Sequence, residues 1–577
     1  MNRLSPTMSA ALKRSQARWD IHLLSKSLRW VGISLSISLL PIAGTMRPAI
    51  GADRIYFTYG ALERSIPIDS LQIYAKTGKF DADLAPYAKR LSRKQRIELQ
   101  RLLVNRIDLN SVAISQFFYS PLGETLLARL GGFVQTRAGL SGFYGIRGAL
   151  ILAAADPQGL TLLNVLQKFP TNGIRVDLTR ILQTMGDMEK LVNQTNRAVA
   201  LVSQQSKIAA STAQPRADFS RLPDLQQRGR FAWSKQTLML NDRRRASKFL
   251  TDIYLPQLDA RAPVIVISYG LGEDRSSFAY LAEQLASYGF VVAIPENPGS
   301  SAQQVRSLLN GLASEVAEPR EFINRALDVK FLLDELQRRS QSDPTFQVNV
   351  QQVGVIGQSF GGYTALALAG APLNFSQLQK GCENLNNSLN LSLLLQCRAL
   401  ELPRFPYDLH DQRIKAAIAI NPIDSSIFGQ ASLSKIQVPV MFISGTSDTV
   451  APALPEQIVP FSWLTTPEKY LVVIQGGTHF STIGDTNASR YPLAIPSQIA
   501  GSNTELARRY VEVLSVAFCQ TYVAGVKEYL PYLSASYAQT ISQAPLNLSL
   551  VQSLTAAQLA PALNGNNKNK VRPSPGK

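Results

Sequence analysis

The stretch that most constrains the fold of this chain is Val353–Gly370, which reads VGVIGQSFGGYTALALAG. Residues 353–356 are mostly apolar and predict the end of a buried strand, whereas residues 362–370 are small or apolar, lack proline and predict a helix. The turn between them has the pattern G-x-S-x-G around Ser359, a sharp bend in which a Cβ on either glycine would collide with backbone. The stretch therefore predicts a nucleophile elbow. The alternative is an ordinary glycine turn, because five letters alone are a weak pattern.

Runs of apolar and β-branched residues on either side of the elbow predict further strands. They lie at residues 231–240, 249–255, 263–269, 290–295, 416–420, 438–444 and 470–474. The first two predict a hairpin, and helical patterns at residues 276–288 and 320–339 separate later strands. Strands that alternate with helices predict a largely parallel sheet with right-handed crossovers, so the expected fold class is α/β.

The first 52 residues differ from the rest of the chain. Lys and Arg side chains precede an uncharged segment at residues 30–46 that is rich in Leu, Ile and Ser. This order is typical of a signal peptide at residues 1–52 and predicts export to the periplasm, the envelope or the outside of the cell. The alternative is a membrane anchor, but the apolar run at residues 31–40 is short for the ~20 residues that a span requires.

Residues 53–210 predict an all-α domain to which we assign no chemistry. Ser92–Gln95 is a capping box, and leucines follow it at helical spacing. This region contains no histidine and no cysteine. The composition of later segments predicts a linker at residues 211–227, a catalytic domain at residues 228–560 and a disordered basic tail at residues 561–577.

The formal net charge of +18 raises the question of an anionic partner. No stripe of Lys and Arg alternates with aromatic residues, and export would separate the protein from most nucleic acid, so we predict no nucleic-acid partner. An anionic membrane or envelope surface fits this charge better. The alternative is a solvated basic surface without a partner.

The chain has three histidines, and their positions select a general base for Ser359. His22 lies in the leader. His479 lies in the sequence GGTHF directly after the last predicted strand, from which a loop can return the imidazole to the elbow. His410 lies in a charged segment before a strand and is expected at the surface or in a cap. We therefore predict that Ser359 is the nucleophile and His479 the general base.

The acid that would orient this histidine should follow a strand between Ser359 and His479. Asp448 lies in GTSDTV just past the predicted strand at residues 438–444, where a buried carboxylate could stabilise the imidazolium. Asp424, after the preceding strand, is the rival, and either residue could instead form a turn. The histidines are too few and the cysteines too scattered for a metal site, so we predict neither a metal nor a cofactor.

An acyl-transfer intermediate also needs backbone N–H groups that hold its oxyanion. The elbow supplies the amide of Phe360. The second donor is expected in the loop after the strand at residues 263–269, and we predict Leu271, which lies between two glycines that permit close approach.

Four motifs, SYGLG, GQSFGG, GTSD and GGTH, resemble those of the α/β-hydrolases, and within them the platelet-activating factor acetylhydrolase-like and dienelactone hydrolase-like groups. The resemblance covers roughly residues 230–530 and implies an α/β-hydrolase fold with esterase activity. The chain departs from the acetylhydrolases at Tyr269, where they have histidine, and at Asn421, where they carry their acid. These two departures leave the esterase prediction unchanged, but they concern which ester is the substrate. The preceding region resembles the N-terminal domain, without a known role, of a family of exported bacterial hydrolases.

Residues 371–413 form an insertion at the position where such hydrolases place a cap over the serine. Its leucines could line an acyl pocket or form the core of a small subdomain. Cys382 and Cys397 flank the Leu/Asn segment of this insertion, and export predicts a disulfide between them, with two free thiols as the alternative. Cys519 is expected to be a lone core thiol.

Together these features predict an exported serine hydrolase that cleaves carboxylic esters through an acyl-enzyme, with lipid-like or short-chain acyl esters as substrates. A serine peptidase or polyester depolymerase on the same fold is the first alternative. A non-catalytic binding protein on a hydrolase scaffold is the second, although such a protein need not keep a nucleophile, a base and an acid.

Overall fold

The computed structural model of this chain describes residues 51–213, 218–344, 346–484 and 497–564. Residues 1–50 of the predicted leader and residues 565–577 of the predicted tail lie outside the described residues. None of the helices in the described ranges combines the length and the apolar character that a membrane span needs.

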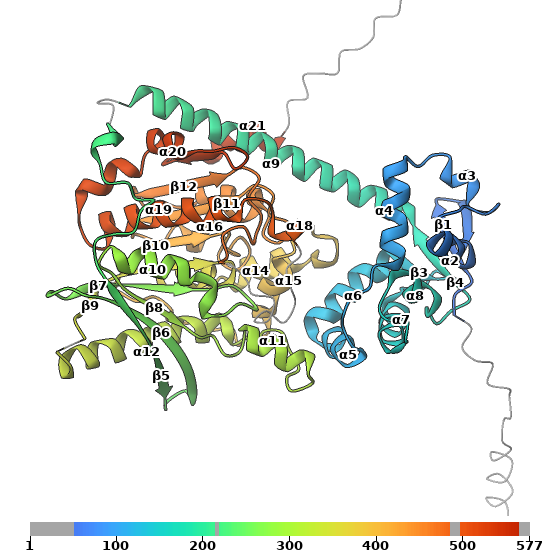
Figure 1. The fold of residues 1–577 in the computed structure, drawn as a ribbon, viewed down its shortest axis with the longest axis horizontal. Helices are drawn as coiled ribbons and strands as arrows, with labels where there is room; N and C mark the ends of the chain where they lie inside the picture. The colour runs from blue at the N-terminus through green and yellow to red at the C-terminus, as the bar shows by residue number, and fades with distance from the viewer. Residues whose placement is uncertain (1–50, 214–217, 345, 485–496, 565–577) are drawn as a thin grey trace, which may run out of the picture. The chain divides into compact units, whose positions relative to one another are not determined.

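A nine-stranded sheet forms the body of the predicted catalytic domain, in the order β13-β12-β11-β10-β9-β7-β8-β6-β5 (Figure 1). Neighbouring strands from β12 to β8 pair in parallel, while β13, β6 and β5 add antiparallel edges. The prediction of an α/β fold with a mostly parallel sheet is confirmed. The strands are β5 (Trp233–Asp242), β6 (Ser247–Pro256), β7 (Ala262–Ser268), β8 (Val291–Pro295), β9 (Val348–Gln358), β10 (Ile414–Ile420), β11 (Val440–Gly445), β12 (Lys469–Ile474) and β13 (Leu548–Val551).

Helices cover both faces of this sheet, which explains why its central strands are almost wholly apolar. Successive residues of β7 point to opposite faces, so that Val264 and Val266 join one buried cluster while Ile265 and Ile267 join the other. The first cluster includes residues of α12 (Glu321–Ser342) and α13 (Phe360–Leu368), and the second includes residues of α10 (Ala279–Ser287) and α19 (Thr504–Tyr522). The other helical segments of this part are η1 (Phe219–Arg221), η2 (Arg275–Phe278), α11 (Ala302–Leu309), α16 (Gly429–Leu433), η5 (Leu454–Ile458), α17 (Val459–Phe461), α18 (Ser497–Ala500), η6 (Lys527–Tyr532), α20 (Ala535–Ile541) and α21 (Ala556–Asn564).

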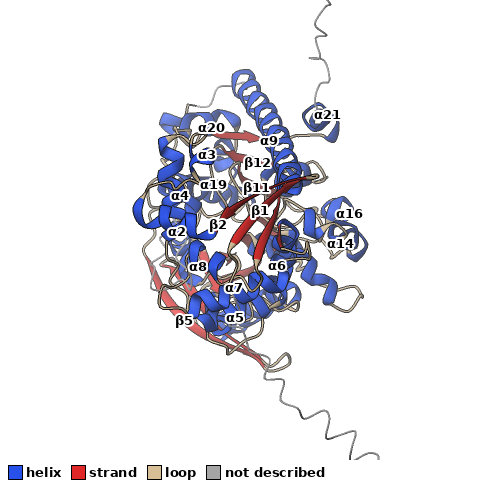
Figure 2. Cartoon of the chain, turned by 90° about the vertical axis from the view of Figure 1, so that its right-hand side faces the viewer, coloured by secondary structure: helices blue, strands red, loops and turns tan. Residues whose placement is uncertain are grey.

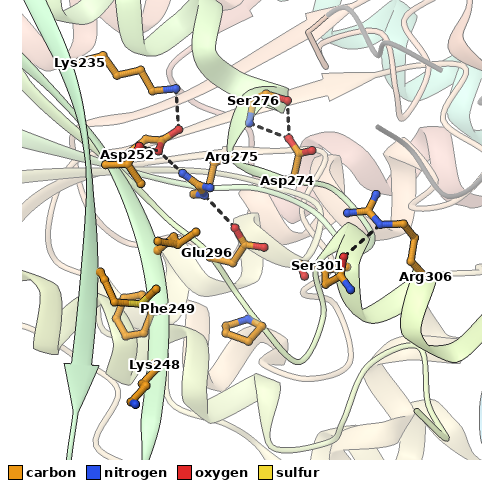
Figure 3. Close-up of a pocket in the computed structure, with 15 residues that line it drawn as sticks. Lys235, Lys248, Phe249, Asp252, Asp274, Arg275, Ser276, Glu296, Ser301 and Arg306 are labelled. Atoms are coloured by element: carbon orange, nitrogen blue, oxygen red, sulfur yellow. Dashed lines mark hydrogen bonds and ion pairs between the residues drawn. The ribbon is translucent and has the colours of Figure 1, made fainter. Parts of the chain in front are cut away.

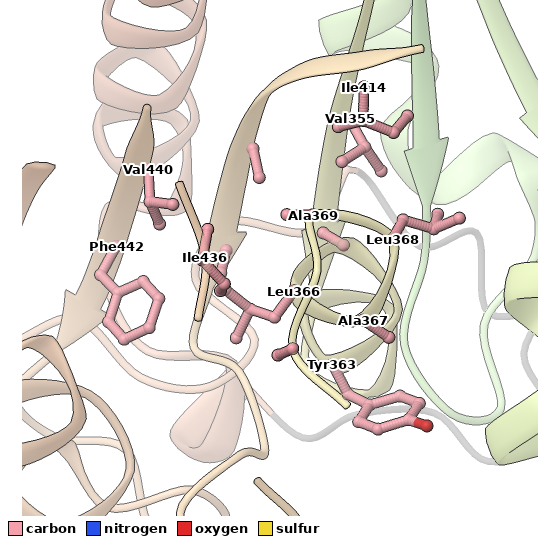
Figure 4. Packing of buried hydrophobic residues seen from close by; sticks show 14 of the residues in the cluster. Val355, Tyr363, Leu366, Ala367, Leu368, Ala369, Ile414, Ile436, Val440 and Phe442 are labelled. Atoms are coloured by element: carbon pink, nitrogen blue, oxygen red, sulfur yellow. The ribbon is translucent and has the colours of Figure 1, made fainter. Parts of the chain in front are cut away.

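The elbow helix α13 is buried along its whole length. In Figure 4, Ile436 lies between Leu366 of this helix and Phe442 of β11, and all three belong to one buried cluster. Tyr363 on the same helix donates a hydrogen bond from its hydroxyl to the carbonyl of Phe322 at 2.6 Å. Close packing of this kind leaves the helix little freedom to move, so the turn at its N-terminus has a fixed position.

The insertion at residues 371–413 folds into short helices between α13 and β10. The predicted disulfide between Cys382 and Cys397 is present, and Cys519 is a buried free thiol. Among the leucines of the insertion, Leu393 is buried while Leu391 is 39% exposed, so this segment contributes both to a core and to a surface. The helices are α14 (Phe375–Cys382), η3 (Leu385–Asn387), α15 (Leu393–Gln396) and η4 (Cys397–Glu401).

A buried carboxyl group fastens this insertion to the rest of the domain. Glu456 is fully buried, and its Oε1 accepts hydrogen bonds from the hydroxyl of Ser392 at 3.0 Å and from Nε2 of Gln396 at 2.9 Å. The side-chain amide of Asn390 donates to the same oxygen. Oε2 accepts from the backbone amide of Asp424 at 2.8 Å, in the loop after β10. One side chain thus holds the insertion and that loop together, and neither of its oxygens is left without a donor.

The region before α9 corrects our prediction of an all-α domain. A four-stranded sheet of order β2-β1-β4-β3 accompanies its helices. β1 and β2 form a hairpin whose turn places Gly60 at φ +55°, and β1 also pairs in parallel with the distant β4. The elements are β1 (Arg54–Tyr59), β2 (Leu62–Pro67), α2 (Ile68–Thr77), α3 (Ala85–Ala88), α4 (Arg93–Val104), α5 (Ser111–Tyr119), α6 (Pro121–Phe133), β3 (Val134–Thr136), α7 (Phe143–Ala155), α8 (Leu162–Gln167) and β4 (Gly173–Asp177).

The long helix α9 (Leu178–Thr212) does not end the small domain as predicted. Its second half packs on α20 and α21, beside β13 (Figures 1 and 2). Ala198 and Val202 are fully buried in the larger cluster of the catalytic domain. Gln194 Nε2 donates to the carbonyl of Leu563 at 2.6 Å. Because α9 packs against both parts, the expected boundary at residue 210 does not separate two independent packing units. Apolar spacing predicts a helix here, but it does not predict which elements the helix packs against.

The predicted linker at residues 211–227 is packed in its described part. Leu225 is fully buried in the cluster that includes α10. Gln284 Nε2 donates to the carbonyls of Leu225 at 3.0 Å and Gln227 at 2.9 Å. The start of the predicted disordered tail is also ordered, because residues 561–564 complete α21.

The disulfide predicts how many thiols react in the unfolded protein. Protein from an oxidising compartment, denatured and alkylated without reductant, should carry one label, on Cys519, and three labels after reduction. Closing a 15-residue separation should also stabilise the fold by about 3 kcal/mol, so Cys382→Ser with Cys397→Ser should lower the unfolding free energy by roughly that amount. Intact mass and denaturant unfolding measure both. Three labels without reductant would rule the disulfide out.

Candidate active site

Ser359 occupies a strained turn between β9 and α13. Its backbone has φ +54° and ψ −116°, a conformation that residues other than glycine rarely adopt. A Cβ on Gly357 would lie 1.9 Å from the carbonyl oxygen of Gly361, and a Cβ on Gly361 would lie 1.8 Å from that of Ser268. Both glycines are therefore required by close backbone approach, as the sequence pattern indicates. The turn leaves Ser359 at the end of the strand and 7% exposed.

The three side chains predicted to act together form one hydrogen-bonded chain. His479 Nε2 lies 2.9 Å from Ser359 Oγ, and His479 Nδ1 lies 2.6 Å from Asp448 Oδ2. All three residues are buried. Because a carboxylate only accepts hydrogen bonds, it selects the tautomer with hydrogen on Nδ1, which leaves Nε2 to accept from the serine hydroxyl. The arrangement can therefore move a proton from Ser359 to the imidazole.

The loop after β11 aims the carboxylate of Asp448. Oδ1 accepts hydrogen bonds from the backbone amides of Val450 at 2.8 Å and Ala451 at 2.7 Å. These two contacts fix the plane of the carboxylate and leave Oδ2 for the imidazole. The preceding strand ends at Gly445, so the side chain lies at the carboxyl edge of the sheet, where the sequence predicts it.

The loop that carries His479 is held by two amide side chains. Gln358 Nε2 donates to the carbonyl of His479 at 2.9 Å. Asn421 Nδ2 donates to the carbonyl of Thr478 at 3.3 Å, while Asn421 Oδ1 accepts from the amide of Gly445 at 2.9 Å. Asn421 therefore ties the histidine loop to the loop of the acid. The sequence did not single out Gln358, and it marked Asn421 only as a departure from the acetylhydrolases.

The rival acid, Asp424, is in a different environment. It is fully buried, and within the described residues neither of its carboxyl oxygens has a hydrogen-bond partner. Burial raises the pKa of Asp424 well above its usual range, and the nearby charge of Glu456 raises it further. Asp424 makes no hydrogen bond to the imidazole, whereas Asp448 Oδ2 lies 2.6 Å from His479 Nδ1, so the geometry favours Asp448 over Asp424.

The second candidate base, His410, lies away from the elbow serine. It is exposed, and its ring lies beside Gly370 at the far end of α13, where a Cβ on that glycine would be 3.7 Å from the imidazole. Its carbonyl accepts from Lys330 Nζ at 2.9 Å. The prediction that His410 belongs to the surface or the cap agrees with this position.

The loop after β7 lies directly against the elbow. Ser268 at the end of β7 is paired in register with Gly357, one residue before Gln358. The carbonyl of Tyr269 would lie 2.9 Å from a Cβ on Gly361, so the two turns are in contact. The amide of Gly272 is already committed to the carbonyl of Ser300 at 2.9 Å. This placement brings Leu271 to the same sheet edge as Phe360, the first residue of α13.

Tyr269, the departure from the histidine of the acetylhydrolases, is part of the core. It is fully buried, and its hydroxyl accepts a hydrogen bond from the backbone amide of Asn297 at 2.8 Å. Burial raises the pKa of Tyr269 well above its usual range. The side chain thus links the loop after β7 to the loop after β8.

A separate cleft of about 700 Å³ lies between the edge strand β5 with its neighbour β6 and the segment of η2 and α11 (Figure 3). None of the residues that line it belongs to the hydrogen-bonded chain described above. Arg275 contacts Asp252 and donates from Nε to Glu296 Oε2 at 2.8 Å, and Lys235 Nζ lies 2.7 Å from Asp252. The charged side chains at the centre of the cleft are thus paired with one another, so we assign the cleft no chemistry. In the described part of the chain, no group of three or more His, Cys, Asp or Glu side chains could hold a metal ion.

Comparison with known proteins matches two parts of the chain to family models. The model described as "Alpha/beta hydrolase of unknown function (DUF1400)" matches residues 51–177, which form the small domain. The model described as "Platelet-activating factor acetylhydrolase, isoform II" matches residues 251–342, from β6 to the end of α12. The second match includes the loop of Leu271 and ends before the elbow.

A relative from Cavia porcellus, platelet-activating factor acetylhydrolase, is 22% identical over 298 residues. The alignment covers 46% of this chain and 59% of the relative, so the chain spans somewhat more than half of that protein's length. These matches agree with the mostly parallel sheet and with the four motifs that carry the resemblance. Both family-model matches and this relative support an α/β-hydrolase of the platelet-activating factor acetylhydrolase-like group.

Proposed function

We propose that the chain is a serine hydrolase that cleaves carboxylic esters through an acyl-enzyme. The observation that carries this proposal is the hydrogen-bonded chain from Ser359 Oγ through both ring nitrogens of His479 to Asp448 Oδ2. An activated nucleophile needs a base within hydrogen-bond reach and a third group that orients the base. The elbow adds the strained turn that presents such a serine at the sheet edge.

In the proposed mechanism, Ser359 Oγ attacks the ester carbonyl while His479 Nε2 takes its proton. Asp448 holds the Nδ1 hydrogen and stabilises the imidazolium. The imidazolium then gives its proton to the departing alkoxide, which leaves an acyl group on Ser359. Water enters, loses a proton to His479 and releases the acid by the same steps in reverse.

The negative oxygen of each tetrahedral intermediate would be held by the backbone amides of Leu271 and Phe360. Phe360 begins α13, so the positive end of that helix points at the same position. The loop of Leu271 is supported by direct contact with the elbow at Gly361. Where it has been measured, removal of one such donor costs about 3 kcal/mol of transition-state stabilisation.

We propose short-chain or lipid-like acyl esters as the substrate class. The matched relative is named an acetylhydrolase, which supports a short acyl group. The exposed Leu391 on the insertion supplies apolar surface for a longer chain. We also propose that the protein works outside the cytoplasm, because structural disulfides such as Cys382–Cys397 form and persist mainly in oxidising compartments.

The substrate class is tested with p-nitrophenyl esters of graded acyl length, together with a p-nitroanilide of the same acyl group. We expect turnover of the esters, no detectable turnover of the anilide, and a loss of about 10⁶ in kcat for Ser359→Ala. The control is Ser536→Ala, which changes a serine on α20, outside the site. Efficient cleavage of the anilide would support a peptidase, and wild-type protein that cleaves no ester would support a binding protein.

The two aspartates provide a matched pair of isosteric changes. Asp448→Asn should lower kcat about 10⁴-fold, because an amide in that position stabilises the wrong imidazole tautomer. Asp424→Asn should change kcat less than about tenfold, since the Asp424 carboxyl group is buried and makes no hydrogen bond to the imidazole. Steady-state kinetics of both variants, with circular dichroism to confirm folding, decide between them. Our assignment fails if Asp424→Asn is the crippling change and Asp448→Asn is active.

A further inference from the structure

Arg325 is a buried arginine for which the proposed mechanism has no role. It lies on α12, and its side chain is completely inaccessible to solvent. A buried guanidinium is costly unless its N–H groups find acceptors and its charge is balanced. The contacts that Arg325 makes therefore indicate why it is there.

Four hydrogen bonds lead from this guanidinium to two loops beside the elbow. Nη1 donates to the carbonyl of Tyr269 at 2.6 Å, and Nη2 donates to the carbonyl of Gly270 at 3.4 Å. Nε and Nη2 both donate to Ser300 Oγ, at 3.0 and 2.8 Å. The carbonyl of Ser300 in turn accepts from the amide of Gly272. Arg325 thus holds the loop on both sides of Leu271.

Peptide geometry turns these contacts into a constraint on the Leu271 amide. The carbonyl of Gly270 and the N–H of Leu271 belong to the same peptide plane and, in a trans peptide, point in opposite directions. A carbonyl held toward Arg325 therefore directs the Leu271 N–H away from it. The forked guanidinium is suited to this task because its planar donors can hold two successive carbonyls at once.

The same guanidinium also contacts the residue of the second proposed donor. Arg325 Cζ lies 4.2 Å from the ring centroid of Phe360, which begins α13, and both side chains are fully buried. A cation over an aromatic face is an attractive contact, and it is stronger where water is excluded. One side chain therefore touches the residues on both sides of the expected oxyanion position.

The charge of Arg325 is balanced by nearby carboxyl groups. Glu321 Oε2 lies 3.9 Å from Arg325 Nε and accepts from Ser300 Oγ at 2.5 Å. Burial lowers the pKa of Arg325 and raises the pKa of Glu321, and the attraction between the two groups opposes both shifts. Burial also raises the pKa of Glu273 to about 7, with the Gly270 amide and the charges of His479 and Arg325 acting against it.

We propose that Arg325 is the positioning residue of the oxyanion hole, which it assembles by holding the carbonyls of Tyr269 and Gly270 and stacking on Phe360. The inference rests on the proposed acyl-transfer function. It adds that the hole is maintained by one buried side chain from a different element, α12. Arg325 does not touch the substrate. Its loss should weaken stabilisation of the transition state without removing the nucleophile, the base or the acid.

The test compares Arg325→Ala and Arg325→Lys with wild type in steady-state hydrolysis of a short-chain p-nitrophenyl ester. We expect kcat to fall about 10² to 10³-fold in Arg325→Ala, as for loss of an oxyanion donor, with KM nearly unchanged. Arg325→Lys should show a similar loss, because lysine keeps a charge but has no planar fork. If Arg325→Ala does not fold, Arg325→Lys carries the comparison.

Guanidinium ion, added far below unfolding concentrations, should restore part of the kcat of Arg325→Ala.

The matched control is Arg245→Ala. Arg245 Nη2 lies 2.6 Å from Asp328 Oδ1 on the same helix α12, and Arg245 Nε lies 2.6 Å from Asp242 Oδ2, without contact to the loop of Leu271. This variant should unfold at a lower temperature and keep the wild-type kcat. The proposal would be overturned if folded Arg325 variants kept the wild-type kcat. It would also be overturned if Arg245→Ala lowered kcat as much as Arg325→Ala does. Failure of the proposed function gives a different result, because wild-type protein would then cleave no ester.

Discussion

The close approach of the elbow to the end of β7 is the constraint on which the site depends. The carbonyl of Ser268 lies so near Gly361 that a side chain there would not fit. The same contact puts the loop of Leu271 against the turn that carries Ser359. A residue at φ +54° costs about 1 to 3 kcal/mol of backbone strain, and only surroundings that cannot relax maintain it. The fully buried helix α13 and the central strands provide such surroundings.

Parallel strands explain how the other functional groups reach this turn. β9, β10, β11 and β12 are neighbours and end at the same edge of the sheet, so residues far apart in the chain meet there. Asn421, after β10, links the loops of Asp448 and His479 through its side-chain amide. The buried side chains of Arg325 and Glu456 hold the loops on either side. The site is thus built from loops, but each loop is fixed by groups that have no access to water.

The sequence predicts the parts of this site that have local signals. Glycine spacing marks the elbow, and Asp448 and His479 each follow directly after a β-branched run that predicts a strand. Arg325 and Glu456 carry no such signal, because charged residues on helices usually face water and their partners lie elsewhere in the chain. The small sheet is missed for a related reason. We predicted no strand there, although aromatic and β-branched residues flank Gly60 at residues 54–67 and are a local signal for the hairpin. The pairing of β1 with β4 has no local signal, because it depends on residues distant in the chain.

The proposed mechanism depends on Ser359 being a nucleophile that His479 activates. The most direct measurement is the site of covalent modification by a fluorophosphonate, determined by mass spectrometry of peptides from the labelled protein. We expect one phosphonyl group per molecule, attached to Ser359, and a much slower reaction in His479→Ala. A protein that stays unlabelled while correctly folded, or that is labelled at another residue, would contradict this mechanism.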